Sequence, residues 1–249
     1  MIKRKIELAK IKKTIVKRPD YISDLVEVEI NPILDGIENN IFTGLIKTSM
    51  INYVITRLVT LLENYFKTLV QELIDKGGFD PTGILPNDEI TISILELEEI
   101  KQEPKVSVGA FISHSINFQN IDNINSTMST LLGGKKFLTR FNDRVSNIDQ
   151  NRNLRIKKRN FFNWEEFQEL FQARHSIIHS IKYDKNISLP KLKRFVFHTR
   201  FFLSEARIIP FFEILERMKE GGDITNRTYT KDLAMWNQIE IDAIQDIYS

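Results

Sequence analysis

The segment TSMINYVITRLVTLLENYFKTLVQELID, residues 48–75, has the clearest helical pattern in this chain of 249 residues. Apolar side chains recur along it every three or four residues, so on a helix they form one broad stripe. Thr48 or Ser49 can cap its start and Gly77–Gly78 can end it, and we therefore expect a helix over residues 48–76. The stripe consists of Ile55, Leu58, Val59, Leu62, Phe66, Leu69, Val70 and Leu73.

Similar patterns continue through most of the chain. We expect helices over residues 120–134, 135–145, 163–182 and 191–222, with Asn163 as an N-cap and with a kink or a break at Pro210. The sequence thus predicts a mainly α fold, an antiparallel bundle of four to five core helices.

The two ends of the chain differ from this central part. Residues 1–45 form an N-terminal extension, and the alternation of Leu25, Val26, Val28 and Ile30 predicts one or two short strands in it. We expect residues 46–220 to form the helical domain and residues 221–249 to form a C-terminal amphipathic helix.

The composition limits the class of protein. The first residues, MIKRKIELAKIKK, lack the apolar core of a signal peptide, and no uninterrupted run approaches the ~18 apolar residues of a membrane span. The chain has no cysteine, which excludes disulfides and thiolate metal sites. We expect a cytoplasmic protein with no membrane segment. The net charge of +2 says little about partners.

A second stretch, LFQARHSIIHS at residues 170–180, bears on function. Its helical stripe comprises Phe167, Leu170, Phe171, Ile177, Ile178 and Ile181, but the position where another apolar residue belongs holds Arg174. Burying an unpaired charge costs several kcal/mol. Arg174 therefore needs a carboxylate partner, for which Glu63 is the candidate, or an anionic ligand, or an opening to solvent.

His175 and His179 lie four residues apart, hence on one side of the same helix. Such a pair can bind zinc, but Ser176 stands where zinc proteases of this pattern have a glutamate, and no acidic residue follows at a suitable spacing. We expect no metal and no other cofactor. Ser176 and Ser180 lack the strand–turn–helix context of a nucleophile.

Arginine and histidine together suit phosphodiester chemistry. Arginine stabilises negative charge on the non-bridging oxygens, and histidine moves a proton to or from the 2′-OH or the leaving 5′-oxygen. Arg174 and His179 lie about 140° apart around a helix, and the long arginine side chain can reach round its flank. No metal is needed when the RNA 2′-OH is the nucleophile.

The sequence RHSIIH, residues 174–179, resembles the R-x4-6-H motif of the HEPN superfamily in its R-[NH]-x-x-x-H form. LVTLLENYFKTLV is similar to the first core helix of HEPN proteins, in which an acidic residue occupies the position of Glu63. The order of a helix, a basic stretch and the motif helix resembles the RiboL-PSP-HEPN branch. The resemblance covers about residues 46–218. The tyrosine that toxins of HEPN–nucleotidyltransferase pairs carry two residues after the histidine is Ile181 here.

This resemblance implies a helical-bundle endoribonuclease that needs no metal and leaves a 2′,3′-cyclic phosphate, in antiphage defence or a toxin–antitoxin system. It implies a homodimer with a composite active site, and an antitoxin or activator protein as a further partner. His179 would be the general acid or base, Arg174 would stabilise the phosphorane, Glu63 would orient either residue, and His175 would assist or bind phosphate.

A basic run precedes the motif helix. It comprises Arg152, Arg155, Lys157, Lys158 and Arg159, and it suggests contacts to the RNA backbone, although a solvated loop is an equal alternative. Phe161, Phe162 and Trp164 follow it. They can stack on bases, but a hydrophobic cluster at the start of the helix is the better interpretation.

Two other functions stay open. A catalytically silent HEPN module would bind RNA or a partner protein as a scaffold. A helical interaction protein would use an Arg174–Glu63 pair only for stability, and removing Arg174 would then destabilise the fold by several kcal/mol.

Overall fold

The computed structural model describes residues 25–75, 79–81, 83–84, 107–151, 162–179 and 187–221. Within these ranges the chain forms helices and no strand, which confirms the mainly α prediction. The expected C-terminal helix and the first 24 residues lie outside them. The elements are η1 (Val26–Ile30), α3 (Asn31–Glu38), α4 (Gly44–Asp75), α6 (Val108–Ser115), α7 (Ile121–Leu131), α8 (Phe137–Asn151), α9 (Trp164–His179) and α10 (Leu189–Gly221).

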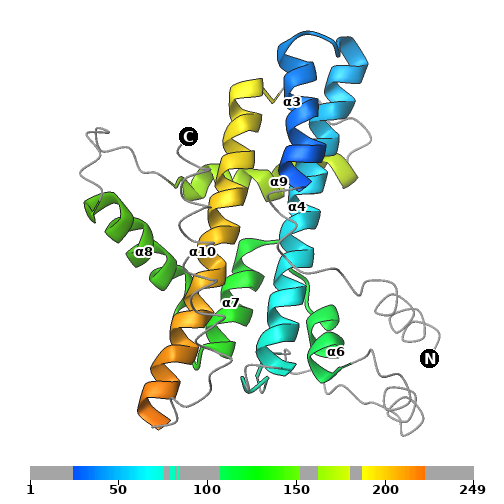
Figure 1. The fold of residues 1–249 in the computed structure, drawn as a ribbon. Coiled ribbons are helices and arrows are strands. Elements are labelled where there is room, and N and C mark those ends of the chain that lie inside the picture. The colour runs from blue at the N-terminus through cyan, green and yellow to red at the C-terminus, as the bar shows by residue number, and fades with distance from the viewer. Residues whose placement is uncertain are drawn as a thin grey trace, which may run out of the picture.

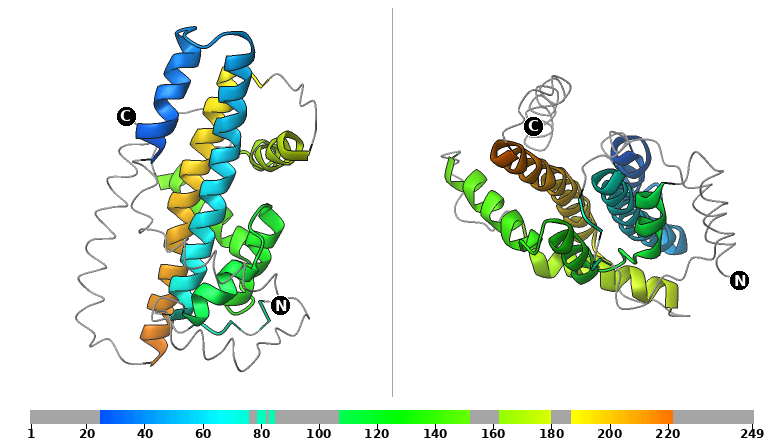
Figure 2. Two further views of the ribbon diagram at one scale, coloured as in Figure 1. Left: turned by 90° about the vertical axis from the view of Figure 1, so that its right-hand side faces the viewer. Right: turned by 90° about the horizontal axis from the view of Figure 1, so that it is seen from below.

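Two long helices, α4 and α10, lie side by side and form the axis of the described structure (Figure 1). Both run from the upper to the lower end of the view, so this pair is parallel and not antiparallel as expected; α3 runs the opposite way beside α4. Figure 2 shows α9 lying across the two long helices. The sequence could not fix these directions, because they depend on connections longer than a tight turn.

Helix α4 is central because it packs against α3, α6, α9 and α10. Its predicted stripe is buried throughout, and Val54, Leu61 and Tyr65 widen the buried surface. Of the described helices, α4 is long and apolar enough to cross a membrane by length and composition. A helix in the middle of a globular core passes the same test, so this is weak evidence, and the expectation of no membrane segment stays a prediction.

The strand prediction for the N-terminal extension is wrong over residues 25–38, which are helical. The apolar residues Val26, Ile30, Leu34 and Ile37 are spaced by three or four, and all four are buried in the core. Val28, which supplied the apparent alternation, is 78% exposed. A short alternating run matches both periods, and here the longer helical spacing decides the structure.

Local signals explain where the helices begin and end. The side chain of Asn163 accepts hydrogen bonds from the backbone N–H groups of Glu165 and Glu166, as predicted for an N-cap. Gly133 and Gly134 follow α7 with positive φ angles of 69° and 81°, a conformation that glycine adopts without strain. Pro210 neither ends nor splits α10, which continues to Gly221.

Helix α6 lies against the last turns of α4 at unusually close range. Asp75, the last residue of α4, accepts hydrogen bonds from the backbone N–H of Gly109 at 2.9 Å and from the hydroxyl of Ser107, the N-cap of α6. A Cβ atom built on Gly109 would lie 2.6 Å from the backbone oxygen of Gln71. Only glycine therefore fits at this contact between the two backbones.

We expect Gly109→Ala to lower the free energy of unfolding by about 1–3 kcal/mol, because the new methyl group overpacks the contact with α4. Helix propensity alone predicts the opposite sign, a gain of about 1 kcal/mol. Urea denaturation followed by circular dichroism measures the difference. Val108→Ala in the same helix is the control, since Val108 is 63% exposed and the change raises helix propensity without adding an atom. Stabilisation by Gly109→Ala would contradict the close contact.

Candidate functional site on helix α9

Helix α9 carries the motif, and its first half anchors it to the core. Phe167, Leu170, Phe171 and Ala173 are buried, and the helix packs against α4 and α10. The predicted stripe does not stay buried through the second half. Ile177 is only partly buried and Ile178 is 48% exposed, so that part of the stripe prediction is wrong. Residue 181 lies outside the described part of the chain.

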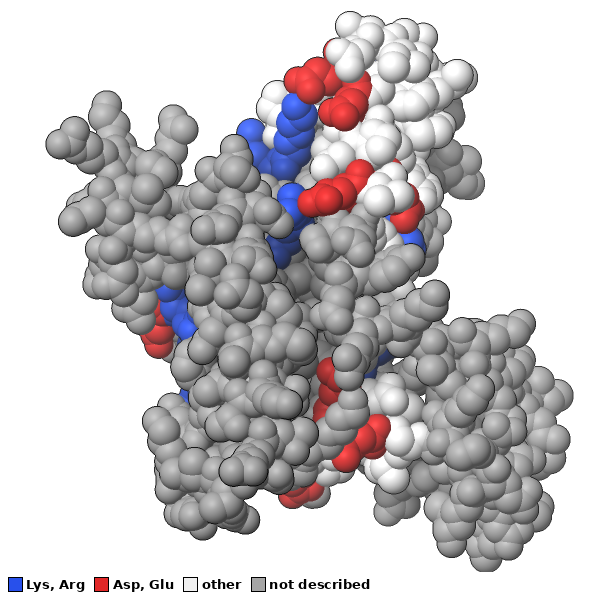
Figure 3. Space-filling model, viewed as in Figure 1, with Lys and Arg blue, Asp and Glu red and all other residues white. Residues whose placement is uncertain are grey.

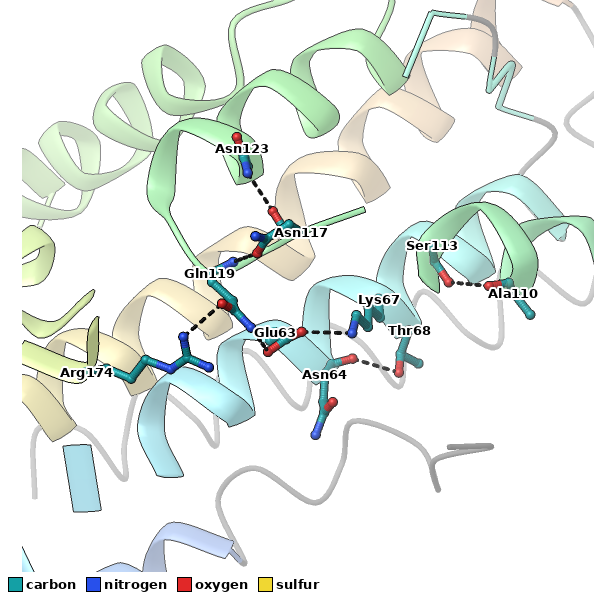
Figure 4. A network of polar contacts seen from close by, with 10 residues as sticks. All are labelled: Glu63, Asn64, Lys67, Thr68, Ala110, Ser113, Asn117, Gln119, Asn123 and Arg174. Carbon is teal, nitrogen blue, oxygen red and sulfur yellow. Dashed lines mark hydrogen bonds and ion pairs between the residues drawn. The ribbon is translucent and has the colours of Figure 1, made fainter. Parts of the chain in front are cut away.

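Arg174 is partly buried and points toward the loop between α6 and α7 (Figure 4). Its Nη1 donates a hydrogen bond to Oε1 of Gln119 at 2.8 Å. The Nε2 of Gln119 in turn donates to Oε2 of Glu63 at 3.3 Å. Arg174 and Glu63 therefore belong to one network, but a neutral amide lies between them. The direct ion pair considered from the sequence does not form.

The charge of Glu63 is balanced on its own helix. Its Oε1 lies 2.8 Å from Nζ of Lys67, one turn along α4, and both side chains are largely buried. The guanidinium of Arg174, by contrast, has no carboxylate partner among the described residues. Its Nε is buried and lacks any hydrogen-bond partner there. The network thus contains one compensated acid and one cation with an unused donor.

Gln119 was missed by the sequence analysis, because it lies in a short loop with no periodic signal. The structure shows why its position is fixed. Phe118, the preceding residue, is fully buried and stacks on Phe66 of α4 at 6.0 Å between ring centroids. The backbone N–H of Gln119 donates to the side chain of Asn117, whose carbonyl accepts from Asn123 of α7. Both ends of the loop are therefore tied down.

His175 and His179 lie on the exposed side of α9, next to one another. Their ring centroids are 4.5 Å apart, as expected for residues one turn apart on a helix. Both side chains are exposed, and within the described part of the chain neither forms a hydrogen bond with Arg174. A single chain thus presents the arginine on one flank of the helix and the histidines on another.

The structure also places His114, which the sequence left unassigned. It belongs to α6 and is partly buried near the Glu63–Lys67 pair. Burial lowers the pKa of His114, the positive charge of Lys67 lowers it further, and Glu63 acts in the opposite direction. Helices α4, α6 and α9 therefore all contribute polar groups to this region.

His198 has a structural environment. It is buried in α10, its Nε2 lies 3.1 Å from a carboxylate oxygen of Glu166, and its ring contacts Phe162. Phe162 itself is buried among Phe141, Trp164 and Phe167. This confirms that Phe162 and Trp164 belong to a hydrophobic cluster at the start of the helix.

The basic run at residues 152–159 lies outside the described residues, and its role stays a prediction. On the face shown in Figure 3, the acidic and basic side chains of the described residues lie interspersed. Lys193 pairs with Glu38 and Arg57 pairs with Glu29, each at 2.8 Å. The described residues contain no group of three or more His, Cys, Asp or Glu side chains that could hold a metal ion.

Comparison with known proteins adds no family to this picture. The chain matches no protein-family model, no curated protein and no solved structure. The argument about function therefore depends on the residues and the geometry of the site.

Two partly buried arginines offer a test of whether Arg174 is structural. Arg144 of α8 pairs at 2.8 Å with Glu205 of α10, whose side chain is only 3% exposed. We expect Arg144→Met to cost about 3 kcal/mol, because it removes a partner from a buried carboxylate. Arg174→Met should cost about 1 kcal/mol or less, because it removes one hydrogen bond and leaves Glu63 paired with Lys67. Urea denaturation measures both; equal losses would contradict this reading of Arg174.

Burial lowers the pKa of His198 below its ordinary value of 6.5, and the bond to Glu166 opposes this effect only in part. Below about pH 6.5 the unfolded chain then binds more protons at this residue than the folded protein, so acid weakens the fold. We expect His198→Phe, which keeps the Glu166–Arg194 pair, to lose less stability than wild type between about pH 7 and pH 5. Urea denaturation across that range tests this, and parallel losses would refute it.

Proposed function

We propose that this protein is a metal-independent endoribonuclease of the HEPN type, which cleaves RNA by attack of the 2′-OH and leaves a 2′,3′-cyclic phosphate. Arg174 stabilises the negative charge of the phosphorane, and His179 acts as general acid or base, with His175 beside it. Glu63 orients Arg174 through Gln119. The biological setting that fits such an enzyme is antiphage defence or a toxin–antitoxin system in the cytoplasm.

The state of Arg174 is the observation that carries this proposal. An arginine with a structural role forms an ion pair with a carboxylate, as Arg144 does with Glu205. Arg174 is held by a neutral amide instead, and its buried Nε has no partner among the described residues. Such a guanidinium keeps its positive charge for an anion, because no carboxylate of the described residues neutralises it. A phosphate group on RNA is an anion of the right geometry for it.

The two exposed histidines supply the proton-transfer groups. They lie on a different flank of α9 from Arg174, so one copy of the chain does not complete the proposed site. Two copies that meet along α9 would bring the arginine of one toward the histidines of the other. The half-exposed Ile178, next to His179, gives this surface an apolar residue that such a contact would cover. A homodimer is therefore part of the proposal.

The silent HEPN module is the competing function. It would use Arg174 to bind RNA or an acidic partner surface and would need neither histidine. The exposure of both histidines, on the helix that carries Arg174, favours the enzyme. A purely structural role for Arg174 is disfavoured by the absence of a direct pair with Glu63.

We expect His179→Ala to lower RNA cleavage about 100-fold or more, because general acid–base catalysis by histidine contributes about 10²–10⁴-fold to such rates. The assay incubates purified protein with a pool of structured RNAs in excess EDTA and determines the end groups of the fragments. Wild type should leave 2′,3′-cyclic phosphates.

Gln172→Ala is the matched control, since Gln172 is exposed on the same helix and outside the network. It should cleave like wild type. Equal cleavage by wild type and His179→Ala would exclude His179 from catalysis. Loss of cleavage in EDTA that magnesium restores would exclude the metal-independent mechanism.

A further inference from the structure

Gln119 joins the two charged groups of the network through the two ends of one amide. Its oxygen accepts from Arg174 and its NH₂ group donates to Glu63 (Figure 4). Only this orientation of the amide satisfies both neighbours, because a guanidinium can only donate and a carboxylate can only accept. Among the natural side chains, glutamine is matched to this position by both its length and its paired donor and acceptor.

The neutrality of this link has an electrostatic consequence. A carboxylate in direct contact with Arg174 would form two parallel hydrogen bonds and neutralise the guanidinium. The amide instead takes one donor, on Nη1, and adds no charge. Glu63 stays one side chain further away, where Lys67 balances it. The amide therefore fixes the direction of the guanidinium without reducing its attraction for an anion.

The loop is built to hold Gln119 in this position. Phe118 anchors it in the core, the side chain of Asn117 accepts from its backbone, and Asn120 caps α7 directly after it. A side chain on such a loop loses little further conformational freedom when it orients a neighbour. This is the arrangement expected of a residue that keeps a catalytic group aimed before substrate arrives.

We propose that Gln119 is a positioning residue for the endoribonuclease reaction. It holds the Arg174 guanidinium, uncompensated, in the direction in which it receives the scissile phosphate. This inference rests on the proposed function in that it names a phosphodiester as the ligand of Arg174. It adds to the R-x4-H motif a residue from a different segment of the chain. It also predicts how the rate of RNA cleavage changes when the amide of Gln119 is replaced.

The decisive variants are Gln119→Glu and Gln119→Met, which keep the length of the side chain. Methionine removes both hydrogen bonds and should lower cleavage about 10-fold or more at every pH. An ionised glutamate should also lower cleavage at neutral pH, because it pairs with Arg174 and repels Glu63. A protonated glutamate restores the original pattern, an oxygen that accepts from Arg174 and an O–H that donates to Glu63.

The rate of Gln119→Glu relative to wild type should therefore rise as the pH falls, whereas the relative rate of Gln119→Met should stay constant. The ratio removes those effects of pH on cleavage that both proteins share. Among the described residues, the other charged and titratable groups around residue 119 are Glu63, Lys67, His114 and Arg174. In an Arg174→Ala background, Gln119→Glu should cause no further loss. A flat ratio for Gln119→Glu, or wild-type cleavage by Gln119→Met, would overturn the proposal.

A binding experiment separates this inference from the proposed function. The probe is an RNA oligonucleotide with every 2′-OH methylated, which keeps its phosphates but cannot react. Wild type should bind it at least about fivefold more tightly than Arg174→Ala, and Gln119→Glu should match Arg174→Ala at neutral pH. This binding result without any cleavage of ordinary RNA would support the claim that Gln119 directs Arg174 toward a phosphate. It would overturn the proposal that the protein is an endoribonuclease. Equal binding by all three proteins would overturn Gln119 as a positioning residue even if wild type cleaves RNA.

Discussion

The contact between Phe66 and Phe118 determines the geometry of the candidate site. Phe66 is fully buried in α4, where it also meets Phe137 of α8 and Phe202 of α10, so three other segments of the chain contact its ring. Glu63 lies one turn before Phe66 and Gln119 directly follows Phe118. The aromatic contact therefore sets the distance between these two polar side chains. Burying a phenylalanine stabilises a fold by about 1.5–3 kcal/mol, whereas a typical neutral hydrogen bond contributes about 0.5–1.5 kcal/mol.

The charged groups of the polar network differ in whether an opposite charge balances them. Glu63 and Lys67 satisfy each other on α4, while Arg174 on α9 receives only the dipole of an amide. Low-dielectric surroundings make this difference matter, since an uncompensated charge in a partly buried position attracts a counter-ion more strongly than one in water. The buried aromatic core offsets the free-energy cost of keeping this charge partly buried, because Phe167 and Leu170 anchor α9 in that core.

Much of the fold, but less of the site, could be predicted from the sequence. The stripe on α4, the Asn163 cap and the stop at Gly133–Gly134 are local signals, and each one holds. The strand expected near Val28 and the burial expected at Ile178 failed because short apolar runs do not reveal which neighbours cover them. Arg174 stood out as a misfit in its apolar stripe, and Glu63 was the candidate carboxylate partner. Gln119 did not stand out, because its role arises only when a loop 55 residues from Arg174 folds against it.

The close approach of α4 and α6 at Gly109 restricts which substitutions this chain can accept during evolution. Gly109 touches the backbone of α4 while its own N–H binds Asp75, a residue 34 positions earlier. A larger residue at 109 would force α6 outward, and the aspartate would then lose the group it binds. We therefore expect positions 75 and 109 to covary among related sequences.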